Sequence, residues 1–149
     1  MVRTWVILLL LAGCTSPTHP AHHIPDPPAE ASACIQDTMP VPFSPPTMWE
    51  VRRHPFTVGA PAVLNLWLAL DWNLPDRPPS SAMGILTDAG GEEAGRVMLG
   101  IDGPTHGSLE MEAVPGNWTL RLETQSPVPA DLVRLSFRIR IGATMEACP

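Results

Sequence analysis

Groups that perform nucleophilic catalysis occur together in one short segment, Asp-Gly-Pro-Thr-His-Gly-Ser at residues 102–108. Asp102, His106 and Ser108 supply an acid, an imidazole and a hydroxyl, and His54 is a second imidazole elsewhere. Members of a catalytic triad normally meet only in the fold, so adjacency in sequence is weak support for one. The chain also lacks a Gly-x-Ser-x-Gly elbow, a His-Glu-x-x-His motif and a phosphate-binding glycine loop. We therefore predict no catalytic residue and no enzymatic activity, and interpret residues 102–108 as a polar turn.

Two further sets of residues have the chemistry of metal ligands. His19, His22 and His23 are imidazoles, which bind copper, nickel and zinc, but a proline-rich stretch around them would not pre-organise a site. Asp71 and Asp88 fall at expected strand ends, where calcium ligands often gather, although no EF-hand spacing is present. We predict no cofactor and keep two alternatives: a metal-handling protein that uses these histidines, and a calcium-stabilised adhesion-type module.

The first cysteine carries a more specific signal. One basic residue, Arg3, precedes an apolar stretch from Trp5 to Ala12, which is typical of a secretory signal peptide and too short for a transmembrane helix. The sequence Leu-Ala-Gly-Cys that ends at Cys14 resembles a bacterial lipobox, in which the cysteine receives acyl chains. The resemblance implies a signal peptide at residues 1–13, a lipid anchor on Cys14, and a place at the extracytoplasmic cell envelope, on the outer membrane if the host has one.

The other cysteines stand at the two ends of the segment that reads as folded. Lipidation of one of the three cysteines leaves Cys34 and Cys148. An oxidising compartment would let them pair. A bridge across so long a loop stabilises a fold by up to about 4 to 5 kcal/mol in the loop-entropy account. We predict this disulfide.

Residues 14–33 differ in composition from the rest of the chain. They are rich in proline and lack a periodic apolar face, which predicts an extended linker before a domain at residues 34–149. The net charge is −6, and all nine basic residues are arginine. An acidic chain without lysine is unsuited to nucleic acid, which needs a cationic patch, and to anionic lipid surfaces. The predicted membrane contact is therefore the lipid anchor alone.

Strict alternation of apolar and polar residues predicts strands in the remaining domain. It is strongest at residues 62–72, 117–124 and 133–141, and weaker at residues 35–41, 48–53, 82–87, 96–101 and 108–113. Turn-forming residues separate these segments, and no stretch has the period of an amphipathic helix. We predict an all-β fold, a single antiparallel β-sandwich of jelly-roll type with about eight strands.

The order of these segments resembles a known pair of families. Leu86, Asp88 and Gly91 are followed by Gly-Asn-Trp-Thr-Leu-Arg-Leu at residues 116–122 and by a last strand. This arrangement over residues 55–142 is similar to the pre-peptidase C-terminal domain and to the P domain of proprotein convertases. The resemblance implies a jelly-roll-like module that accompanies an enzyme or binds a substrate, although this chain carries no catalytic domain.

Two tryptophans are the candidate binding residues. Trp67 faces away from the leucine row of its predicted strand, and Trp49 follows a proline-rich segment. Exposed aromatic side chains of this kind often form binding surfaces. We therefore expect a membrane-anchored, non-catalytic binding or accessory module whose partner is an envelope protein or glycan.

Overall fold

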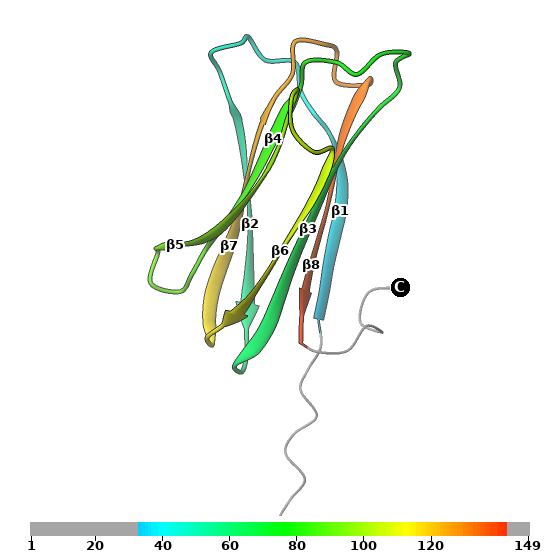
Figure 1. Cartoon of the computed structure of the whole chain (residues 1–149). Helices are drawn as coiled ribbons and strands as arrows, with labels where there is room; N and C mark the ends of the chain where they lie inside the picture. Colours follow the sequence, from blue (N-terminus) through cyan, green and yellow to red (C-terminus); the bar gives the residue numbers. More distant parts are fainter. Residues whose placement is uncertain (1–32, 143–149) are drawn as a thin grey trace, which may run out of the picture.

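A computed structural model of the chain describes residues 33–142 (Figure 1). Within this range the regular structure consists of strands, and no helix is present. The eight strands are β1 (Ala33–Pro40), β2 (Glu50–Val58), β3 (Ala62–Trp72), β4 (Ser81–Thr87), β5 (Glu93–Leu99), β6 (His106–Ala113), β7 (Gly116–Gln125) and β8 (Val133–Ile141).

The strands form two four-stranded sheets packed face to face (Figure 1). Sheet A has the order β1-β8-β3-β6 and sheet B the order β2-β7-β4-β5. Every pair of neighbouring strands is antiparallel. Only β4 and β5 are consecutive in sequence and adjacent in one sheet, whereas the other connections cross between sheets. This is the strand order of a jelly roll, so the predicted fold class is confirmed.

Alternating side chains of the central strands fill the space between the sheets. Leu64, Leu66 and Leu68 of β3 have no exposed surface, and Asn65 and Trp67 between them face outward. Burying one such side chain stabilises the fold by about 1.5 to 3 kcal/mol. The same alternation buries Trp118 of β7, whose indole Nε1 donates a hydrogen bond of 2.9 Å to the carbonyl oxygen of Val114. The period-two pattern therefore identified the core of these strands correctly.

Strand β2 departs most from the sequence prediction of a strand at residues 48–53. It spans Glu50–Val58, and only Phe56 and Val58 within it are buried. The strand lies at the edge of sheet B, where Pro55 and two adjacent arginines, Arg52 and Arg53, interrupt the apolar alternation. Proline and charge on an edge strand discourage pairing with other chains. An edge position therefore explains why the local pattern indicated the wrong boundaries.

The connections are divided between the two ends of the sandwich. The loops β1–β2, β3–β4, β5–β6 and β7–β8 gather at one end, which we call the distal end (Figure 1). The start of β1 and the end of β8 lie at the other end, where Ala33 pairs with Ile141. The described domain therefore holds four of its six crossing connections opposite the place where the chain enters and leaves it.

Candidate binding surface around Trp67

Trp67 lies near the middle of the outer face of sheet A. Its strand, β3, is flanked by β8 and β6, and Trp67 is directly opposite Arg138 on one side and Ser108 on the other. The side chain is 36% exposed although the strand is internal. A large apolar side chain that faces solvent from an internal strand contributes no burial between the sheets. It is available for contact with another molecule.

Arg138 places a positive charge beside the indole. The central guanidinium carbon of Arg138 is 5.8 Å from the centre of the Trp67 ring, which is within cation–π range. At exposed sites such a contact is worth about 0.5 to 1 kcal/mol. It brings together an aromatic face and a group with several hydrogen-bond donors. Both features face solvent on adjacent strands.

A shallow hollow of about 430 Å³ adjoins this pair. Within it the hydroxyl oxygens of Thr38 and Ser136 are 3.0 Å apart and share a hydrogen bond. The hollow is lined by Gln36, Asp37, Thr38, Trp67, Ser136, Phe137 and Arg138. Because the lining includes an amide, hydroxyls, a carboxylate and a guanidinium around one indole, the hollow suits a ligand that is polar at its edge and apolar on one face.

The second predicted residue, Trp49, is also exposed, at 42%. It immediately precedes β2 of sheet B and lies near the distal end, whereas Trp67 is on sheet A. The structure therefore does not bring the two tryptophans into one site. Gln36, Thr38, Ser136 and Arg138 were not predicted as site residues. Their outward positions follow from strand alternation, but their nearness to Trp67 requires the pairing of β1, β8 and β3.

The two aspartates considered for calcium are far apart in the fold. Asp71 is near the distal end of β3 and lies opposite Arg134 of β8. Asp88 begins the β4–β5 turn at the other end, where its Oδ1 atom accepts hydrogen bonds from the backbone N–H groups of Gly90 and Glu92. Among residues 33–142 no group of three or more His, Cys, Asp or Glu side chains is placed to hold a metal ion. His19, His22 and His23 lie outside the described residues.

His54 is separated from the other groups considered for a catalytic triad. His54 points between the sheets and packs against Phe137, with ring centres 4.7 Å apart. His106 and Ser108 are exposed on the edge strand β6, and Asp102 is in the loop before it. The structure therefore does not place His54 beside the hydroxyl of Ser108.

Of the three cysteines, only Cys34 lies within the described residues. It is in β1, opposite Arg140 of β8. Cys14 and Cys148 lie outside the described range, so the lipid anchor and the disulfide stay predictions.

The fold defines the protein as a jelly-roll β-sandwich with an aromatic and polar surface on one sheet. Neither a family model nor a curated protein sequence matches the chain. The described residues contain no helix with the length and apolar character of a membrane span. Any assignment of function therefore rests on the site itself.

Proposed function

We propose that this protein is a lipid-anchored envelope protein whose sandwich binds a glycan on the outer face of sheet A, without catalysing a reaction. The observation that carries the proposal is the exposed indole of Trp67 at a hollow lined by polar side chains. The C–H face of a sugar ring packs on an indole, while its hydroxyls form hydrogen bonds at the edge of the ring. Thr38, Ser136 and Arg138 supply such partners.

The lipobox resemblance and the linker support the envelope location. Cys14 would anchor the chain, and the proline-rich residues that follow could extend to roughly 60 Å at about 3 Å per residue. Because β1 is the first strand and begins at the end opposite the distal loops, the lipid-anchored linker would join the sandwich at that end. The outer face of sheet A then remains accessible along its whole length.

Soluble glycan fragments released from bacterial cell envelopes test this proposal. We expect the full chain in detergent to bind them, and Trp67→Ala to weaken binding by about tenfold or more, because a stacked aromatic side chain is lost. Trp49→Ala is the matched control, since this tryptophan is similarly exposed but immediately precedes a strand of the other sheet. Calorimetric titration measures the affinities, and thermal unfolding checks that both variants remain folded. Equal affinity of the folded Trp67→Ala variant and the original chain would refute the proposal.

A further inference from the structure

The outer face of sheet B carries a line of arginines, which we call the arginine row: Arg53, Arg121 and Arg96. Arg53 of β2 is directly opposite Arg121 of β7. Arg121 is opposite Ile85 of β4, which is in turn opposite Arg96 of β5. With strands about 4.8 Å apart, the row crosses the whole sheet over roughly 14 Å. It lies on the sheet opposite to the one that carries Trp67.

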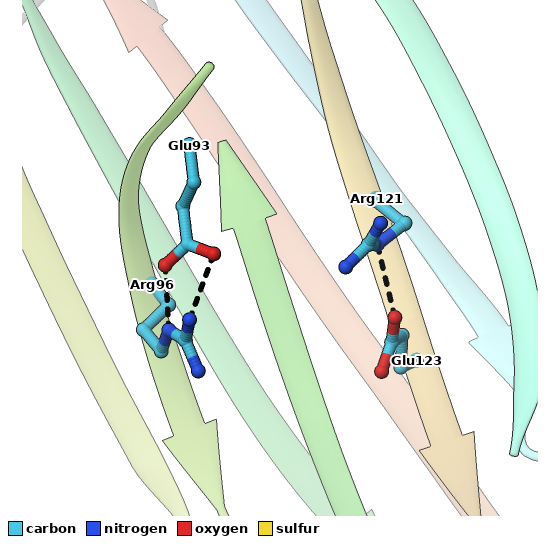
Figure 2. A network of polar contacts seen from close by, with 4 residues as sticks. All are labelled: Glu93, Arg96, Arg121 and Glu123. Atoms are coloured by element: carbon cyan, nitrogen blue, oxygen red, sulfur yellow. Dashed lines mark hydrogen bonds and ion pairs between the residues drawn. The ribbon is translucent and has the colours of Figure 1, made fainter. Parts of the chain in front are cut away.

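Carboxylates neutralise two members of this row, Arg96 and Arg121 (Figure 2). Glu93 holds Arg96 through two contacts of 2.6 and 2.7 Å, and its hydrogen bond and charge raise the pKa of Arg96. Glu123 lies 2.9 Å from Nε of Arg121. Among residues 33–142, no carboxylate forms an ion pair with Arg53. One positive charge of the row therefore remains uncompensated.

The arrangement does not serve the stability of the sheet. Like charges directly opposite each other on neighbouring strands destabilise a sheet. Nε of Arg121 is buried and has no hydrogen bond, because its contact with Glu123 lacks hydrogen-bond geometry. The chain has a net charge of −6, so a row of three arginines on one face contrasts with the acidic composition of the whole chain. An approaching anion would relieve the repulsion between Arg53 and Arg121.

An apolar row lies next to the arginine row, one step toward the distal end. Val51 and Met98 are 45% and 61% exposed, and Met83 of β4 lies opposite Met98. Glu123 separates Val51 from Met83 in the same line. Trp49, which is 42% exposed, immediately precedes the same strand β2. Tryptophan, methionine and arginine are the residues enriched at protein–protein interfaces.

We propose that this face of sheet B binds an acidic segment of a partner protein. Arg53, the member of the arginine row that has no ion pair among residues 33–142, would bind a carboxylate of that segment, for which arginine has the matching planar arrangement of donors. The apolar row would cover the apolar side chains of the same segment. An acidic polysaccharide offers the charges but no flexible apolar side chains to bury against the aliphatic Val51 and Met98, so charge complementarity together with the apolar row favours a polypeptide.

Two probes with the full chain in detergent distinguish these ligands: a synthetic peptide of glutamate and leucine, and dextran sulfate. We expect the peptide to bind and Arg53→Gln to weaken it by about tenfold, because a charge-assisted hydrogen bond is lost. Arg52→Gln is the matched control, since it removes the same charge from the same strand but from the opposite side. We expect it to change the affinity by less than about twofold. Met98→Ser should weaken binding of the peptide but not of dextran sulfate.

Thermal unfolding of the same variants completes the test. We expect Arg53→Gln to unfold at the same or a higher temperature, because the repulsion from Arg121 is removed. Equal losses in Arg52→Gln and Arg53→Gln would overturn the proposal, because binding would then follow net charge alone. It would also be overturned if the peptide did not bind, or if dextran sulfate bound more tightly with the same dependence on Arg53. Trp67→Ala should leave peptide binding unchanged. The proposal for sheet B can therefore be refuted without refuting the proposal for sheet A, and the reverse also holds.

Discussion

Ala33 and Ile141 lie opposite each other in register, at the edge where β1 joins β8. The first and last strands of the sandwich are therefore neighbours. The start of β1 and the end of β8 lie at the same end of the sandwich (Figure 1). This relationship makes the domain suited to attachment at one end. It also bears directly on the two predictions that concern cysteines.

The first prediction is that Cys34 and Cys148 form one disulfide. Cys148 lies six residues after Gly142, the last described residue. A segment of six residues can span up to about 20 Å. Because β1 and β8 are adjacent, Cys34 lies within that reach. Non-reducing mass spectrometry after alkylation should show neither of the two cysteines modified. Two alkylated thiols in the folded protein would contradict the prediction.

The second prediction is that Cys14 holds the protein on the membrane. We expect Cys14→Ser to move the protein into the soluble fraction after a high-salt wash, because two or more acyl chains provide stable anchoring, whereas a chain with a net charge of −6 is not attracted overall to anionic lipids. Cys34→Ser is the control and should remain in the membrane fraction. Retention of the Cys14→Ser variant would show that something other than the lipid anchors the chain.

The third prediction concerns the close approach of the two sheets at Gly84. A Cβ atom on Gly84 of β4 would lie 2.7 Å from Cδ1 of Leu68, which is fully buried in β3. We expect Gly84→Ala to lower the free energy of unfolding by about 1 to 3 kcal/mol, as overpacking in a core does. Urea unfolding measures the change.

Gly59→Ala provides the matched control for this change. A Cβ atom at Gly59, in the turn between β2 and β3, would have no neighbour within 4 Å. The substitution should leave stability unchanged or raise it by about 0.4 to 1 kcal/mol, since alanine restricts the unfolded chain. Equal effects at both positions would show that the sheets do not meet as closely as described.

The fourth prediction is that metal ions do not stabilise the sandwich. A ligand at a hundred times its dissociation constant stabilises a fold by about 2.7 kcal/mol. No group of three metal-ligating side chains occurs within residues 33–142, so we expect calcium, zinc, copper or EDTA to leave the unfolding temperature unchanged. A clear rise with calcium would favour the adhesion-type alternative. Heat of copper or zinc binding that disappears when His19, His22 and His23 are replaced would favour the metal-handling alternative.

The sequence by itself determined the fold class and the buried face of the strongest strands. Alternation is a local property, because successive side chains of a strand point to opposite sides. It therefore identified Leu66 and Leu135 as core residues and Trp67 as an outward residue before any partner strand was known. It was weakest at β2, because an edge strand needs fewer buried side chains and carries arginine and proline instead.

Only the tertiary structure decided which outward residues lie together. Trp67 and Arg138 are 71 positions apart in the chain, and Arg53 and Arg121 are 68 apart, yet each pair is directly opposite in a sheet. Alternation gives the face on which each residue lies but not its partner strand, its register or its sheet. Those depend on how the crossing connections arrange the strands and on which long-range pairing buries both apolar faces at once. The aromatic surface of sheet A and the arginine row of sheet B are consequences of that arrangement.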